Sequence, residues 1–312
     1  MNSNQQALDL HQCFTGAEQR KRLLHHLEAL HETNPSQDQL RNFLRAVDQS
    51  QLDFCNFITS IWIELDQDDL LQGQTIPNVF VGFKIAASDA MILAVLHQLQ
   101  PDLSDPTRKQ ISRLAQLSQR YGGQLAHFGV MMSRATSAVR MNFQGIQRID
   151  AVDFLDRAGW CDDLEDIAEF LTTACGLSRR RNIALDIGET VFPKLGVEIF
   201  PDYGSPRDSF WQALLAELVD RGLADSHKVS DVLAFQGTLS PVNEPDCWPD
   251  SLMIDHLFAP QGDLPWMLFR ISHVKLSWLA GNVSAKIYLV AEPFWQHIES
   301  VGSSQSRIEL AS

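Results

Sequence analysis

Long apolar runs and signatures of secretion are missing from this sequence. No stretch approaches the roughly 18 to 20 apolar residues that a membrane-spanning helix needs. The opening Met-Asn-Ser-Asn-Gln-Gln lacks the basic head and apolar core of a secretion signal. We therefore expect a cytoplasmic protein with no membrane partner.

Paired cysteines are also missing. The five cysteines are scattered and odd in number, and no two stand in a Cys-x-x-Cys arrangement: Cys13, Cys55, Cys161, Cys175 and Cys247. A disulfide framework or a cysteine zinc site would need pairs at short, regular spacing. Free thiols in a reducing compartment are the simplest interpretation.

Positive charge is scarce. Twenty-five Lys and Arg stand against 39 Asp and Glu, which gives a net charge of −14 and an isoelectric point near 5.0. An acidic surface repels phosphate backbones and anionic lipid, so nucleic acid and membranes are excluded as expected partners. The argument concerns the outer surface only, and an enclosed basic site is compatible with it.

Familiar catalytic motifs are absent as well. The sequence has no Gly-x-Gly-x-x-Gly, no Gly-Lys-Ser/Thr and no serine nucleophile elbow. His25, His26 and His31 lack metal-ligand spacing, so we predict no metal site there. Asp162–Asp166 matches the DDxxD pattern that binds magnesium in all-helical terpene enzymes, but acids in the first turn of a helix explain it more simply.

What the sequence does contain is a repeated alternation of helical and strand periodicity. Two N-terminal helices fill residues 1–50, and one domain fills residues 51–298. In that domain, pairs of helices alternate with pairs of strands. Strands are predicted at 57–66, 79–84, 126–133, 138–143, 182–188, 194–200, 268–278 and 285–290. Helices are predicted at 88–99, 107–120, 150–158, 163–175, 205–222 and 226–235. Ser36 and Gln39 fit a capping box for the second N-terminal helix.

Two segments fall outside this pattern. Residues 237–267 are rich in proline and are predicted to be an irregular insertion, or to hide a further hairpin. The polar tail at 299–312 is predicted to be disordered.

The predicted strands have one apolar and one polar face, because alternate side chains point to opposite sides of a sheet. The polar face collects Glu64, Asp66, Lys84, His127, Ser133, Arg140, Asn142, Asp186, Lys194, Glu198, His273, Lys275, Lys286 and Tyr288. An open α+β sheet would leave this face in water. Eight sequential antiparallel strands tend to close, however, and so we expect an α+β antiparallel β-barrel of repeated ααββ units with the helices outside.

A closed lumen would concentrate the basic side chains. Charge-assisted hydrogen bonds there would suit a multiply charged anion, and a diphosphate fits better than a carboxylate. The residues that would bind it are Lys84, Arg140, Lys194, Lys275 and Lys286.

This layout resembles the ABBA-type prenyltransferases, both the aromatic and the cyanobactin-like peptide enzymes. The resemblance rests on this layout, and the strand residues that match the family by position are Arg140 in Ala-Val-Arg-Met-Asn-Phe, Lys275 in Ser-His-Val-Lys-Leu-Ser-Trp, and the Lys286-x-Tyr288 pair. It implies transfer of an isoprenoid group from an allylic diphosphate to an aromatic or peptide side chain. It assigns the diphosphate to these residues and Lys84, and the acid that orients the acceptor to Glu64, with Asp66 as the alternative.

The sequence departs from the family in two respects. Four clear ααββ units are present where the family has five. Only three tyrosines exist (Tyr121, Tyr203 and Tyr288), so Trp62, Phe80 or Trp278 would have to shield the allylic cation. No cofactor is firmly implied, and Mg²⁺ accompanying the diphosphate stays open.

Two other functions stay open. The barrel could bind an anionic small molecule or peptide without catalysis. A metal or acid–base enzyme could use Glu64, Asp66, Asp186 and Glu198, although we expect Asp186 and Glu198 to form salt bridges with Arg140 and Lys194.

Some polar residues have a structural and a functional interpretation. His127 and His273 lie mid-strand and could act as general bases, but hydrogen-bonded structural roles are favoured. Arg179–Arg181 is predicted to be a solvated loop, with docking of a leader peptide or phosphate as the alternative. Trp62 and Asn142 are further lumen candidates.

Overall fold

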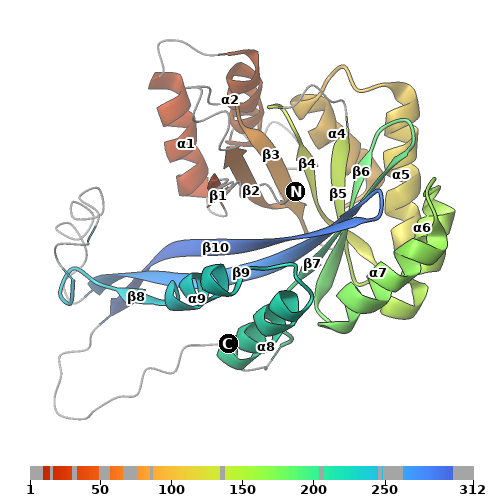
Figure 1. The fold of residues 1–312 in the computed structure, drawn as a ribbon. Helices are drawn as coiled ribbons and strands as arrows, with labels where there is room; N and C mark the ends of the chain where they lie inside the picture. Colours follow the sequence, from red (N-terminus) through yellow and green to blue (C-terminus); the bar gives the residue numbers. More distant parts are fainter. Residues whose placement is uncertain are drawn as a thin grey trace. The chain divides into compact units, whose positions relative to one another are not determined.

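The computed structural model describes residues 10–14, 17–29, 34–48, 57–65, 76–84, 87–133, 138–203, 207–244, 248 and 263–297 (Figure 1). The chain divides into two compact units. The first unit contains Met1–Thr173, Arg181–Val197 and Trp278–Gly281. The second unit contains Ala174–Arg180, Glu198–Ser277 and Asn282–Ser312.

The strands form one ten-stranded antiparallel sheet. They are β1 (Leu10–Phe14), β2 (Ile58–Leu65), β3 (Asn78–Phe83), β4 (Gln124–Val130), β5 (Val139–Gln144), β6 (Arg181–Ile187), β7 (Val191–Ile199), β8 (Gly237–Leu239), β9 (Asp263–Leu279) and β10 (Asn282–His297). The hydrogen-bonded order is β1-β2-β3-β4-β5-β6-β7-β9-β10, and β8 pairs with β9. The α+β class and the antiparallel sheet are thus confirmed.

The predicted closure into a barrel is corrected to an open sheet. Among the described strands, the order ends at β1 and β10, and no pairing joins these two. Strand length gives a physical reason. β9 and β10 have 17 and 16 residues, whereas β1 has 5 and β3 has 6. A barrel needs strands of matched length and a consistent stagger, and this long terminal hairpin does not match the short first strands.

Pairs of helices separate the hairpins, as predicted. The described helices are α1 (Ala17–Ala29), α2 (Pro35–Asp48), α4 (Asp89–Leu99), α5 (Asp105–Arg120), α6 (Ala151–Ala158), α7 (Leu164–Gly176), α8 (Arg207–Asp220) and α9 (Ser226–Ala234), with a short 3₁₀ turn, η2 (Arg148–Asp150), before α6. In the first unit, α4 to α7 cover one face of the sheet (Figure 1). None of the described helices is long and apolar enough to cross a membrane.

The helix-covered face of the sheet is the predicted apolar face. Phe128, Met141, Phe143 and Leu185 are all fully buried beneath the helices. Phe143 meets the ring of Phe154 on α6 edge-on, with centroids 5.5 Å apart. The parity argument is therefore confirmed in the centre of the sheet. It weakens in the middle of β10, where Leu289 is 40% exposed.

Two strands, β1 and β8, were not predicted from the sequence. β1 pairs with β2 in the register Cys13↔Trp62, although Leu-His-Gln-Cys-Phe shows little alternation. β8 lies inside the segment predicted to be irregular and pairs Gly237–Leu239 with Met267–Phe269 of β9. The remainder of the Pro-rich segment, at 245–247 and 249–262, lies outside the described residues, as does the tail at 299–312.

The residues that cap the start of α2 differ from the predicted ones. The Asn34 side chain accepts a hydrogen bond from the Gln37 N–H at 2.9 Å, and the Asn34 N–H donates to the Gln37 side chain at 3.2 Å. This reciprocal pair is a capping box. It replaces the predicted pair of Ser36 and Gln39, because Pro35 is well suited to the first helical position.

Gly129 on β4 provides a test of packing. A Cβ atom placed there would lie 2.4 Å and 2.5 Å from two carbons of the Phe80 ring. Gly129→Ala should therefore lower the free energy of unfolding by about 1–3 kcal/mol in urea denaturation. Gly237→Ala is the matched control, because nothing lies within 4 Å of its added Cβ. Equal stability of the two variants would contradict the packing described for Phe80.

Candidate functional site

One register places a row of side chains across the polar face of the first unit. Trp62 lies opposite Phe80, Phe80 opposite Gly129, Gly129 opposite Arg140, and Arg140 opposite Asp186. Directly opposed residues share a face of the sheet. We call this set the Trp62–Asp186 row. It brings two aromatic side chains and a charged pair onto one surface, opposite the face that the helices cover.

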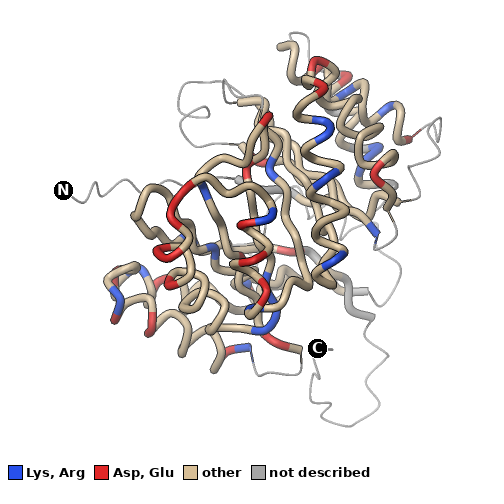
Figure 2. Tube along the Cα trace, turned by 90° about the vertical axis from the view of Figure 1, so that its right-hand side faces the viewer, with Lys and Arg blue, Asp and Glu red and all other residues tan. Residues whose placement is uncertain are grey.

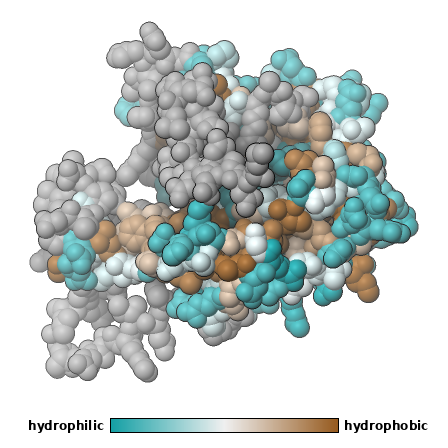
Figure 3. Space-filling model, in the orientation of Figure 1, coloured by the Kyte–Doolittle hydropathy of each residue, from teal (hydrophilic) through white to brown (hydrophobic). Residues whose placement is uncertain are grey.

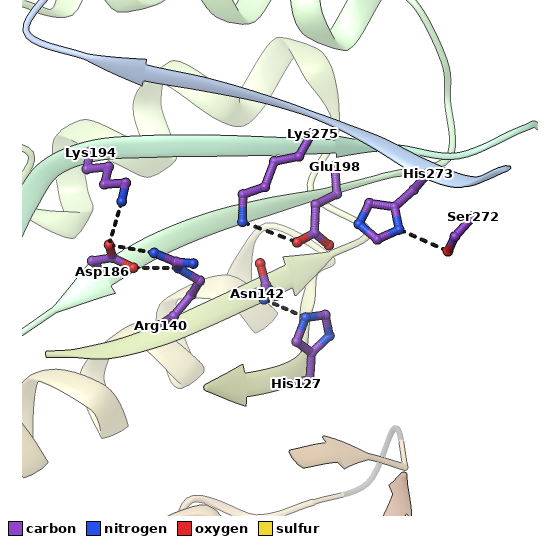
Figure 4. Close-up of polar contacts among 9 residues, drawn as sticks. All are labelled: His127, Arg140, Asn142, Asp186, Lys194, Glu198, Ser272, His273 and Lys275. Carbon is purple, nitrogen blue, oxygen red and sulfur yellow. Dashed lines mark hydrogen bonds and ion pairs between the residues drawn. The ribbon is translucent and has the colours of Figure 1, made fainter. Parts of the chain in front are cut away.

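Asp186 holds two cations at one end of this row (Figure 4). The Arg140 Nε and Nη2 atoms donate to the two Asp186 carboxylate oxygens at 2.7 Å and 3.0 Å. Lys194 Nζ lies 3.7 Å from Asp186 Oδ2. The side chains of Arg140 and Asp186 are 11% and 18% exposed, and that of Lys194 is 40% exposed. The predicted salt bridges of Asp186 are confirmed, and the three formal charges sum to one positive charge.

Phe80 and Trp62 are the aromatic side chains of the same row, and Phe80 is the more buried of the two at 9% exposed. The absence of a Cβ at Gly129 lets the Phe80 ring lie against the β4 backbone. Trp62 is 37% exposed, and its indole N–H donates to Ser60 Oγ at 3.1 Å. The sequence analysis did not single out Gly129, although a glycine inside a strand is a known sign of close approach by another group.

His127 and Asn142 form a second polar contact beside the row. They lie directly opposite each other on β4 and β5, and Asn142 Nδ2 contacts His127 Nε2. His127 also meets the Phe80 ring edge-on at 6.2 Å. Asn142 is fully buried, so this contact with His127 lies beneath the surface of the sheet.

Of the two predicted acids, the structure describes the position of Glu64 only. Glu64 lies two residues after Trp62 on β2, opposite Asn78 of β3, and is only 4% exposed. It therefore faces the same side of the sheet as the row. Asp66 lies outside the described residues.

Lys84 lies apart from the other predicted basic residues. It is exposed at the end of β3 and lines a small pocket with Ile92 of α4 and Ala115 of α5. Both of these helices cover the apolar side of the sheet. The structure therefore does not place Lys84 in the Trp62–Asp186 row, because β3 ends before the alternation reaches it.

The second unit holds the remaining predicted basic residues. Lys275 of β9 forms an ion pair with Glu198 at 3.4 Å, and both side chains are at most 10% exposed. Glu198 thus pairs with Lys275, a partner that the sequence analysis did not predict for it. Lys286 lies 5.1 Å from the centre of the Tyr288 ring. The predicted diphosphate residues are thus divided, with Lys84, Arg140 and Lys194 in the first unit and Lys275, Lys286 and Tyr288 in the second.

His273 lies at the centre of an aromatic stack in the second unit. Its ring centre is 4.2 Å from that of Tyr288, with the two rings nearly parallel, and 5.1 Å from that of Phe200. Its Nδ1 forms a hydrogen bond with Ser272 Oγ at 3.0 Å. Both predicted histidines therefore make hydrogen bonds, as the structural interpretation expected.

Charged and hydrophobic residues are also found outside these clusters. Basic and acidic residues are scattered along the described trace (Figure 2), and hydrophobic residues lie in several separate areas among hydrophilic ones on the face seen in Figure 3. Val283 and Leu289 of β10 are exposed. Within the described residues, no three His, Cys, Asp or Glu side chains gather in a position to hold a metal ion.

Comparison with models of known protein families, with curated proteins and with solved structures found no match for this chain. What is established is an α+β protein with a long antiparallel sheet. Its function is therefore inferred from its own residues and their geometry.

The buried Glu198–Lys275 pair makes a stability prediction. Glu198→Gln should lower the free energy of unfolding by about 3–5 kcal/mol, because the lysine charge stays buried without its partner. Adding Lys275→Met should recover at least half of that loss, since both charges are then gone. Arg221→Gln, which removes an exposed pair with Glu217, is the control and should cost less than about 1 kcal/mol. A double variant less stable than Glu198→Gln would contradict this account of the pair.

Proposed function

We propose that the polar face of the first unit binds an isoprenoid diphosphate and transfers its prenyl group to an aromatic or peptide side chain. The observation that carries the proposal is the Trp62–Asp186 row, in which two aromatic side chains lie beside a charged cluster with one excess positive charge. An allylic diphosphate has the same two parts, a polyanionic head and an apolar, cation-forming tail.

Arg140 and Lys194 would bind the diphosphate. Hydrogen bonds to charged groups contribute about 1.5–3 kcal/mol each. Asp186 holds the Arg140 guanidinium in a fixed orientation, so little reorganisation is needed when negative charge develops on the leaving group. The Lys194 side chain, 40% exposed and 3.7 Å from Asp186, would contact the ligand from the solvent side while Arg140 stays in place.

The aromatic side chains would stabilise the other product of dissociation. When the C1–O bond breaks, its electron pair leaves with the diphosphate, and an allylic cation remains. Phe80 and Trp62 offer ring faces whose attraction for a cation is worth about 0.5–2 kcal/mol each. The acceptor then attacks C1 and loses a proton, which Glu64 would take. Mg²⁺, if required, would accompany the diphosphate.

A non-catalytic binding protein is the second candidate. The Arg140 guanidinium already donates two hydrogen bonds to Asp186, at 2.7 Å and 3.0 Å. Part of its capacity to bind a ligand anion is therefore used. The excess of only one charge suits a monoanion as well as a diphosphate. A metal or acid–base centre gains no support, because Asp186 is paired with cations and Glu198 with Lys275.

Thermal unfolding with dimethylallyl, geranyl and inorganic diphosphate, each with magnesium or a chelator, tests the proposal. A ligand that binds only the folded state raises the midpoint, by about 4 °C for a chain of this length at roughly 100 times its dissociation constant. We expect geranyl diphosphate to give a larger shift than inorganic diphosphate. Arg140→Gln should abolish both shifts, whereas Arg157→Gln, which breaks an exposed pair with Asp153, should preserve them. No shift with any diphosphate, or equal shifts in Arg140→Gln, would contradict the proposal.

Asp186→Asn tests the charge arrangement separately. Removing the carboxylate takes one negative charge away from Arg140 and Lys194, so inorganic diphosphate should bind several-fold more tightly in calorimetric titration. The same change should lower the free energy of unfolding by about 1–3 kcal/mol, because two cations lose their partner. Weaker diphosphate binding in a folded variant would show that the cluster does not face the ligand.

A further inference from the structure

An arginine of the second unit lies between two aromatic rings. The guanidinium carbon of Arg180 is 5.3 Å from the centre of the Phe200 ring and 4.6 Å from that of Tyr203. Arg180 is exposed, and Tyr203 is 86% exposed. Among the described residues, the Arg180 guanidinium has no ion pair, and Tyr203 has no ring contact other than Arg180. We call Arg180 and Tyr203 the Arg–Tyr clasp.

Hydrogen bonds fix the two loops that carry this clasp. Asp202 Oδ1 accepts from the backbone N–H groups of Arg179 and Arg180, both at 3.0 Å, and from Ser178 Oγ at 2.9 Å. The Phe200 N–H donates to the Arg180 carbonyl at 3.0 Å. Partial burial raises the pKa of Asp202, but the hydrogen bonds from Ser178, Arg180 and Arg179 outweigh it and hold this pKa below its ordinary value.

The aromatic stack fixes the inner side of the clasp. Phe200 packs against His273 at 5.1 Å, and His273 stacks on Tyr288 at 4.2 Å. Phe200 therefore contacts both His273 and Arg180. A guanidinium stacked on a ring keeps its N–H groups at its edge, where they can bind an oxyanion through two parallel hydrogen bonds.

We propose that the Arg–Tyr clasp is a binding site for an oxyanion carried on a planar ring, an aryl phosphate or an aryl carboxylate. The anion binds at the edge of the Arg180 guanidinium, and the ring of the ligand stacks on the exposed face of Tyr203. In a chain with a net charge of −14, an exposed guanidinium with no acidic partner in the described structure is a local centre of attraction for such an anion. Arg181, the third residue of the basic run, takes no part, because it is buried and donates to the Ile146 carbonyl.

Calorimetric titration of the full chain at low salt with phenyl phosphate, benzoate and inorganic phosphate tests the site. We expect saturable binding of at least one aryl ligand, and the tighter of the two identifies the anion. Phenyl phosphate should bind more tightly than inorganic phosphate, because only the former can stack. Arg180→Gln should weaken aryl binding about tenfold or more, and Tyr203→Leu should remove the advantage of the aryl ligand. Both positions are exposed, so both variants should unfold at the wild-type midpoint.

Two controls separate this site from other cations. Arg221→Gln removes an exposed arginine of the same unit that is paired with Glu217, and it should leave aryl binding unchanged. Arg140→Gln alters the proposed diphosphate site and should also leave it unchanged. No saturable aryl binding, undiminished binding in Arg180→Gln, or equal binding of phenyl and inorganic phosphate would overturn the proposal. Loss of binding in Arg140→Gln alone would do so as well.

Discussion

Strand register is the constraint on which the rest of this structure depends. From β2 to β6 each strand pairs with the next in a register that keeps one face apolar, and that face is buried under helices. The side chains at the alternate positions then lie on the opposite face. A slip of one residue would exchange the two faces completely. The same register that buries Phe128 and Met141 therefore brings Trp62, Phe80 and Arg140 together.

Acidic side chains pair with basic ones in both of the polar clusters described above. Asp186 orients Arg140 and attracts Lys194, and Glu198 neutralises Lys275. Positive charge is thus presented in small, fixed amounts and not as a broad basic surface, in keeping with a chain of net charge −14. Arg180 differs, because aromatic rings and backbone hydrogen bonds position it without an acidic partner in the described residues.

Periodicity predicted the helix pairs, four hairpins and the buried face, because these depend on patterns that persist over many residues. It missed β1 and β8, which are short and lack alternation, and which form through pairing with β2 and β9. The alternation of side chains between the two faces of the sheet also predicted that Arg140, Asn142 and Asp186 share the polar face. It failed for Lys84, which lies beyond the last paired residue of β3. Which acid pairs with which cation depends on the distances between side chains of neighbouring strands. These distances cannot be obtained from a single sequence.

The structure of the chain in complex with geranyl diphosphate tests the central claim most directly. The account predicts diphosphate oxygens within hydrogen-bond distance of Arg140 and Lys194, and the prenyl chain against Phe80 and Trp62. A diphosphate bound elsewhere, or a prenyl chain directed away from the Trp62–Asp186 row, would contradict it.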